Sequence, residues 1–227
     1  REIWRNLPSP IRLAIRGLAG AGSAAEKSLQ LKDLPPAVQK TIRDTLKGGD
    51  FIAEQPPVKG MCHAAPHIIY LLDRMGVPFN RTSEGLLDFR RFGGTMFNRT
   101  AFAGASTGQQ LLYALDEQVR RYEDEGLVKK HEYWEYLGFV KDEQGACRGI
   151  VAADLRTMQI ESFAADAVCL ATGGPGIVYG RSTNSTINTG SANGRSYMDG
   201  AIYSNAEFVQ VHPTAIPGED KHRLMSE

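Results

Sequence analysis

The sequence has few cysteines, no excess of charge of either sign and no long apolar run. Its three cysteines, Cys62, Cys147 and Cys169, are far apart and odd in number, which favours neither a disulfide framework nor a paired-thiol metal site. A reducing compartment is therefore expected. The 26 basic and 26 acidic side chains cancel, so nucleic acid is not an expected partner. No apolar stretch approaches the roughly 20 residues that a membrane-spanning helix needs, so this chain is not expected to cross a membrane.

The composition is typical of a folded globular protein. The chain has 227 residues, of which 42% are hydrophobic and 23% charged, enough to bury one sizeable core. Residues 1–47 form a head segment rich in proline, glycine and alanine, in which one short helix is expected from Ala37 to Leu46. Turn signals alternate with periodic segments from residue 48 onward. We therefore expect a domain boundary there and one domain over residues 48–227.

Two further helices are predicted from the spacing of apolar residues. The first is expected from Pro66 to Met75, because Pro66 can begin a helix and Gly76 can end one. The second is expected from Thr107 to Glu123, with the Thr107 hydroxyl capping the helix and Gln110 reaching back to it. Its apolar stripe consists of Leu111, Leu112, Leu115 and Val119.

Short strand patterns follow the second helix. They cover Tyr133–Val140, Gly149–Asp154 and Gln159–Phe163 and are separated by turns such as DEQGA, which predicts a small antiparallel meander. The run Ala167–Ala171 has the composition of a buried strand, and it ends at Thr172 and two glycines where bare backbone can approach a cofactor. A glycine pair after a strand is more often a plain turn, and no G-x-G-x-x-G pattern is present.

Two later segments are rich in groups that can bind ligands. Residues 182–194, STNSTINTGSANG, are dense in hydroxyls and amides and could line a ribityl or phosphate chain, or form a long surface loop. In residues 207–227 an alternating strand is expected to end just before His212, with Ser226 and Glu227 after a turn. Histidine and serine can donate hydrogen bonds to a carboxylate and glutamate can move protons, so these residues suit an acidic small molecule. A lone histidine is nevertheless more often structural.

Two other patterns carry less weight. His63 and His67 are four residues apart, but Pro66 between them makes a continuous helix doubtful, so no metal is expected. The RRFGG run, residues 90–94, could place an aromatic ring against a flat ligand, although a tight structural turn is the more economical interpretation.

The order and wording of several segments resemble the flavoprotein subunit of succinate dehydrogenase and fumarate reductase, in its Bacillus-like branch. The segments begin at residue 48 and are GGDFIAEQPPVKGMCHAAPHIIYLLDRMGVPFNR, EGLLDFRRFGG, STGQQLLYALDEQVRRYE, IVAADL, ATGGPGIVYGRSTNSTINTGSANG and FVQVHPTAIPGEDKHRLMSE. The resemblance implies an α/β fold, part of a glutathione-reductase-like FAD-binding domain with a β meander and without the first nucleotide-binding βαβ unit. Residues 1–47 do not share it, and the chain is expected to be an internal piece of a longer subunit.

The resemblance also implies roles for individual residues. The cofactor FAD would be bound by Thr172, Gly173, Gly174, Thr183, Asn184, Thr189 and Ser191. Ser191 stands where many relatives have an aspartate, so that contact differs. Phe92, His212 and Ser226 would bind the dicarboxylate, His212 and Glu227 would be catalytic, and Glu227 would begin the proton path.

The implied function is FAD-dependent oxidation of succinate to fumarate, or the reverse, in the tricarboxylic acid cycle and respiratory chain. The implied partners are the iron-sulfur subunit and heme b membrane anchor of respiratory complex II, which place the protein peripherally on the cytoplasmic face of the plasma membrane. Two alternatives are an L-aspartate oxidase or soluble fumarate reductase relative, and a catalytically inert fragment. The isolated piece is expected to be inactive. The direction of reaction, the quinone and covalent attachment of FAD stay open.

Overall fold

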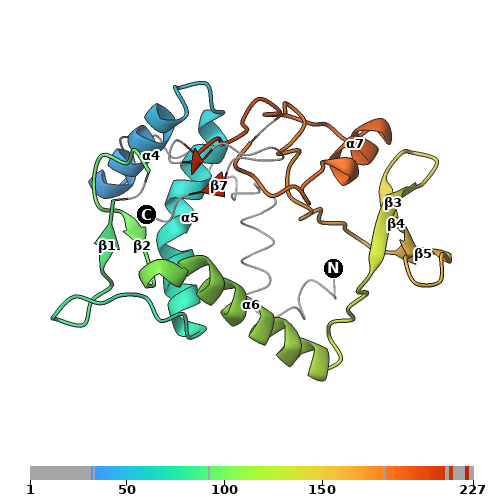
Figure 1. The fold of residues 1–227 in the computed structure, drawn as a ribbon, viewed down its shortest axis with the longest axis horizontal. Helices are drawn as coiled ribbons and strands as arrows, with labels where there is room; N and C mark the ends of the chain where they lie inside the picture. The colour runs from blue at the N-terminus through green and yellow to red at the C-terminus, as the bar shows by residue number, and fades with distance from the viewer. Residues whose placement is uncertain are drawn as a thin grey trace. The chain divides into compact units, whose positions relative to one another are not determined.

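The structure is a computed structural model that describes residues 32, 34–91, 93–180, 182–212, 215–216 and 223–224. It mixes helices with short strands, as the α/β prediction requires (Figure 1). The chain divides into two compact units after Lys129. Within the described ranges, no helix is both long enough and apolar enough to cross a membrane.

The described part of the first unit contains two packed helices, α4 (Pro36–Gly48) and α5 (Gln55–Arg74). Helix α4 confirms the helix predicted from Ala37 to Leu46. Leu34, Ile42 and Cys62 form a buried apolar cluster between the two helices. The domain boundary expected after residue 47 stays a prediction, and α4 runs across that position.

Helix α5 corrects a second expectation, because it begins eleven residues before Pro66 and continues through it. A proline inside a helix removes one backbone hydrogen bond and costs about 3 kcal/mol. Both halves of α5 are held by packing: Val58 and Cys62 contact one apolar cluster, and Ile69 and Leu72 contact another. This burial offsets the lost hydrogen bond, so the predicted start at Pro66 is wrong.

A small hairpin and a further helix follow α5 in the described part of the first unit. Strands β1 (Phe89–Arg90) and β2 (Thr100–Ala101) pair antiparallel. The short 3-10 helix η2 (Gly104–Ser106) leads into α6 (Thr107–Asp124), which confirms the predicted helix. The second apolar cluster combines Ala101 of β2 and Ala114 of α6 with Val77 and Phe79, which lie in the chain between α5 and β1.

Two details predicted for α6 are wrong. The residue before the helix is Ser106, which makes no side-chain cap, and the Thr107 hydroxyl instead accepts a hydrogen bond from the Ala103 N–H at 2.9 Å. The predicted apolar stripe is mostly exposed, because Leu112 and Leu115 are 65% and 46% exposed. The buried face of α6 carries Ala114 and Tyr122.

The second unit confirms the predicted meander. Strands β3 (Trp134–Lys141), β4 (Cys147–Asp154) and β5 (Ile160–Ala164) form an antiparallel sheet in that order. The DEQGA turn between β3 and β4 is closed by the Asp142 carboxylate, which accepts a hydrogen bond from the Ala146 N–H at 2.8 Å. Three rings, those of His131, Trp134 and Phe163, contact one another edge to face.

Helix α7 (Ser191–Met198) packs against β3 through polar contacts. The Tyr136 hydroxyl lies 3.1 Å from the Ser196 hydroxyl, and Asp199 Oδ2 accepts a hydrogen bond from the Phe139 N–H at 3.1 Å. The sequence pattern placed residues 182–194 in one polar segment and missed this helix. Because α7 begins at Ser191, the irregular part of this polar segment ends at Gly190.

Two strands predicted for the second unit are wrong. Residues 167–171 form no strand, and most of them are exposed. A buried strand needs neighbouring strands to satisfy its backbone, and no described strand pairs with this run. The chain before His212 is also irregular, and the next strands are the short pair β6 (Ala215–Ile216) and β7 (Arg223–Leu224).

Candidate cofactor and substrate site

The polar loop of residues 182–190 packs against the glycine-rich run of residues 172–176 in the second unit. The Asn193 side-chain N–H donates to the Gly173 carbonyl at 3.1 Å. Gly173 has a φ of +76°, and a Cβ there would lie 3.0 Å from Asn188 Oδ1. A Cβ on Gly190 would lie 2.6 Å from the Pro175 Cβ. Glycine is therefore needed at both positions for the two segments to approach this closely.

Hydrogen bonds within the loop fix Asn184. The buried Ser182 hydroxyl accepts from the Asn184 backbone N–H at 2.9 Å and lies 3.1 Å from its side-chain nitrogen. The same side-chain nitrogen donates to the Gln210 carbonyl at 3.0 Å. Asn184 thus joins the polar loop to the segment that follows α7.

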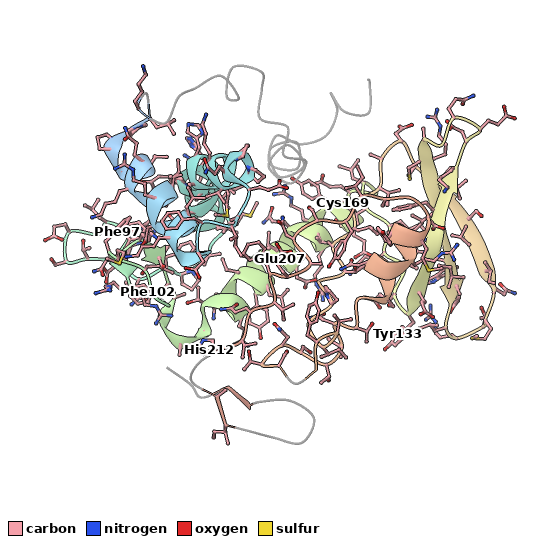
Figure 2. All side chains as sticks on the ribbon, turned by 90° about the horizontal axis from the view of Figure 1, so that it is seen from above. Phe97, Phe102, Tyr133, Cys169, Glu207 and His212 are labelled. Carbon is pink, nitrogen blue, oxygen red and sulfur yellow. The ribbon has the colours of Figure 1, made fainter. Side chains whose placement is uncertain are left out.

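Thr183 makes the second connection between these segments. Its hydroxyl, which belongs to a residue only 8% exposed, accepts a hydrogen bond from the His212 backbone N–H at 2.9 Å. Glu207 and His212, both labelled in Figure 2, belong to the irregular segment of residues 201–212 that carries this contact. Thr183 and Asn184, predicted on the cofactor side, are therefore brought together with the segment of half-buried His212, predicted on the substrate side.

The remaining predicted cofactor residues lie on the exposed side of the same two runs. Thr172, Gly173 and Gly174 are exposed, as are Thr189 and Ser191. The Thr189 hydroxyl is 3.4 Å from the Ser191 N–H, and Ser191 is the first residue of α7. These positions leave their polar groups available to a bound molecule.

Three predicted site residues lie outside the described residues. These are Phe92, Ser226 and Glu227, so their roles stay predictions. The rings of His63 and His67 are 6.5 Å apart on the continuous helix α5. No cluster of three or more metal-ligating side chains occurs among the residues that the structure describes.

A comparison with known protein families identifies the family of this chain. The family model described as FAD binding domain matches residues 18–227. The chain belongs to the FAD binding domain family. The match includes thirty residues of the head segment, 18–47, in addition to the whole of residues 48–227.

Relatives of the chain include flavoprotein subunits of succinate dehydrogenase and fumarate reductase. The chain is 72% identical over 184 residues to the succinate dehydrogenase flavoprotein subunit of Bacillus subtilis, covering 81% of this chain and 31% of that protein. It is 37% identical to the fumarate reductase flavoprotein subunit of Mycobacterium tuberculosis, covering 80% of this chain and 30% of that protein. The chain thus spans about a third of the length of these relatives. The predicted resemblance to this family and its Bacillus-like branch is confirmed.

Solved structures agree with the sequence relationship. FrdA of the Escherichia coli quinol fumarate reductase superposes with a TM-score of 0.73 at 31% identity, covering 90% of this chain and 34% of that one. A Mycobacterium smegmatis Sdh1 structure in complex with UQ1 gives a TM-score of 0.65 at 26% identity, covering 71% of this chain and 28% of that one. The likeness extends to most of the FAD-binding domain described here.

The family model and the flavoprotein relatives confirm the predicted cofactor, FAD. The chemistry of the polar loop is compatible with this cofactor. Residues 172–193 contain no acidic side chain and are rich in hydroxyl and amide groups, as a group with two phosphates requires. The glycines at 173 and 190 allow two backbone runs to lie against each other. The assignment of individual residues to FAD, namely Thr172, Gly173, Gly174, Thr183, Asn184, Thr189 and Ser191, stays a prediction.

The sequence did not indicate which residues hold this loop in its conformation. Asn188 and Asn193 contact Gly173, and the Gln210 carbonyl holds Asn184. The only signal was the density of amides in STNSTINTGSANG, which marks the segment as polar. It cannot indicate which amide points at which glycine, because that depends on the folding of the loop.

Proposed function

We propose that this chain is part of the flavoprotein subunit of a succinate:quinone oxidoreductase, which oxidises succinate to fumarate or catalyses the reverse reaction with FAD. One observation carries the proposal: the Thr183 hydroxyl accepts a hydrogen bond from the backbone of His212. This contact joins a residue of the cofactor loop to the residue proposed to bind a substrate carboxylate. The 72% identity to a succinate dehydrogenase flavoprotein subunit supports the same reaction.

The proposal extends to the rest of the complex. A glutathione-reductase-like domain completed by the parts absent from this chain would bind FAD, and an iron-sulfur subunit with a heme b membrane anchor would receive the electrons. The flavoprotein would then lie peripherally on the cytoplasmic face of the plasma membrane. The names of the Escherichia coli and Mycobacterium smegmatis structures include quinol and UQ1, which supports a quinone as the redox partner of the complex.

The proposed division of labour follows from side-chain chemistry. Oxidation removes a hydride from one carbon of succinate and a proton from its neighbour, and bound FAD supplies the two-electron acceptor. The His212 ring and the Ser226 hydroxyl donate hydrogen bonds to one substrate carboxylate, which fixes the reacting carbons. Glu227 accepts the proton and passes it toward solvent. The contact with Thr183 keeps the backbone of His212 at a fixed place beside the cofactor loop.

The variant His212→Ala in the full-length subunit tests this role. Loss of a hydrogen bond to a charged group costs about 1.5–3 kcal/mol, so KM for succinate is expected to rise about tenfold or more. Flavin content should not change, because the contact with Thr183 uses the backbone of His212. His67→Ala, on an exposed position of α5, is the matched control. Succinate kinetics equal to those of the control would contradict the proposed role of His212.

A further inference from the structure

The backbone of residues 172–174 is exposed and contains two glycines, which have more conformational freedom than any other residue. In the described part of the chain, these three residues make one hydrogen bond. The Gly173 carbonyl accepts it from the Asn193 side-chain N–H at 3.1 Å. The polar contact that fixes this run therefore comes from a single side chain.

A second amide packs against the same glycine. A Cβ on Gly173 would lie 3.0 Å from Asn188 Oδ1 and 3.2 Å from Asn188 Cγ, so the Asn188 amide lies directly beside the bare Cα. The Asn188 backbone N–H donates to the Ser185 carbonyl at 3.2 Å, which holds this residue within the polar loop. Gly173 is thus packed by one amide and hydrogen-bonded by the other.

Asn193 belongs to a helix that is itself well anchored. It lies in the first turn of α7, where the Gly194 N–H donates to the Gly190 carbonyl at 2.9 Å. Helix α7 lies beside β3 (Figure 1) and is joined to it by the contacts of Ser196 and Asp199 described above. A side chain on a packed helix is placed more accurately than one on a loop. The Asn193 amide therefore holds Gly173 at a fixed place relative to the meander.

The stability of α7 does not explain why asparagine occupies position 193. Asparagine is a poorer helix former than alanine or leucine, and no side chain caps the start of this helix. The Asn193 side chain instead reaches a carbonyl twenty positions earlier in the chain. Its contribution is therefore to the glycine-rich run and not to its own helix.

We propose that Asn193 is a positioning residue for FAD: its side-chain amide holds Gly173, so that residues 172–174 keep the backbone conformation that binds the cofactor. This inference rests on the part of the proposed function that concerns FAD, and not on the reaction with succinate. Asn193 does not need to touch the cofactor. It fixes the run before FAD arrives and so removes conformational freedom that binding would otherwise have to remove.

The test compares the full-length flavoprotein with its variants Asn193→Ala and Asn193→Leu. Both variants lose the N–H donor, and leucine keeps approximately the shape of asparagine. Apoprotein produced without riboflavin is titrated with FAD, and binding is followed by the change in flavin fluorescence. Because the backbone of about one residue must then be fixed on binding, the dissociation constant of FAD is expected to rise about fivefold to thirtyfold in both variants.

The melting temperature of the apoprotein separates this role from a purely structural one. Alanine and leucine are better helix formers than asparagine, which offsets the lost hydrogen bond. The apoprotein of both variants should therefore melt close to the wild-type temperature although it binds FAD more weakly. Asn193→Gln keeps an amide donor on a longer side chain, so its dissociation constant should lie between those of wild type and Asn193→Ala.

Gln144→Ala is the matched control. It removes an exposed amide from the turn between β3 and β4 in the same unit, and the hydrogen bond described for Gln144 uses its backbone N–H. Its dissociation constant for FAD is expected to equal that of wild type.

A wild-type dissociation constant in Asn193→Ala and Asn193→Leu would overturn the proposal, and if one of them does not fold, the other decides. Weaker FAD binding that is accompanied by a marked fall in the melting temperature of the apoprotein would also overturn it, because the role would then be structural. Wild-type protein that binds FAD tightly but whose flavin is not reduced by succinate would contradict the proposed reaction and leave this inference intact.

Discussion

Gly138 of β3 lies against the side chains at the end of α7, so a substitution there tests how α7 supports the polar loop. Gly138 has a φ of +156°, and a Cβ there would lie 2.8 Å from Asp199 Oδ2 and 3.1 Å from the Arg195 Nε. Real Cβ atoms do not approach an oxygen this closely, so in Gly138→Ala the Asp199 side chain must move. It then loses the hydrogen bond that it accepts from the Phe139 N–H at 3.1 Å.

The expected loss of stability follows from two contributions. A hydrogen bond to a charged acceptor is worth about 1.5–3 kcal/mol, and a side chain at this φ costs about 1–3 kcal/mol of backbone strain. The Arg195–Asp199 ion pair is half exposed on the arginine side and adds little. Together these contributions are expected to destabilise the second unit by about 2.5–6 kcal/mol.

The loss of stability should weaken FAD binding, because α7 begins at Ser191, directly after the polar loop of residues 182–190 that is proposed to bind FAD. We expect Gly138→Ala in the full-length protein to release flavin at a lower temperature, measured by the rise of flavin fluorescence on heating. Gly145→Ala is the control: its φ is +81° and no atom lies within 4 Å of its Cβ position, so it carries the backbone strain without the clash. Flavin release at the same temperature in both variants would refute the reasoning.

Two further predictions concern the meander. In Gly149→Ala the new Cβ would lie 2.0 Å from the Phe163 carbonyl oxygen, which can yield only if β4 and β5 separate. A loss of about 3 kcal/mol or more is expected in denaturant unfolding, and wild-type stability would contradict it. The hydrogen bond from the Ala146 N–H, and secondarily Arg148, lowers the pKa of Asp142. A carboxyl group with a lowered pKa in the folded protein stabilises the fold above that pKa, and this stabilisation is lost as the pH falls through it. Protonation of Asp142 weakens its hydrogen bond with the Ala146 N–H, so amide exchange at Ala146 should accelerate only below about pH 4. Exchange already accelerated well above that pH, or an unchanged pH profile in Asp142→Asn, would count against this.

Local patterns predicted the elements whose stability is local. The alternation over residues 133–163 and the DEQGA turn predicted the meander, because each strand pairs with its neighbour in sequence. Apolar spacing likewise predicted α4 and α6. The predicted strand at residues 167–171 failed because its partners would be distant strands, which its own composition does not reveal.

The parts of the fold and of the candidate site that the sequence did not reveal depend on contacts between distant residues. Asp44 and Arg99 form an ion pair although they are separated by 55 positions, and nothing in the sequence around either indicates the pairing. Thr183 and His212 were each predicted as site residues by resemblance, but their direct contact spans 29 positions and emerges only in the fold. Helix α5 continues through Pro66 for a similar reason, since packing of both its halves outweighs a strong local preference.

The proposed function requires that this chain belongs to a flavoprotein that takes electrons from a dicarboxylate. The most direct measurement is the visible absorption of the full-length protein with its bound flavin after anaerobic addition of succinate, with dithionite added afterwards as the reference for full reduction. If the proposed function is right, succinate bleaches the oxidised-flavin band and fumarate restores it. A band unchanged by succinate but bleached by dithionite would contradict the account.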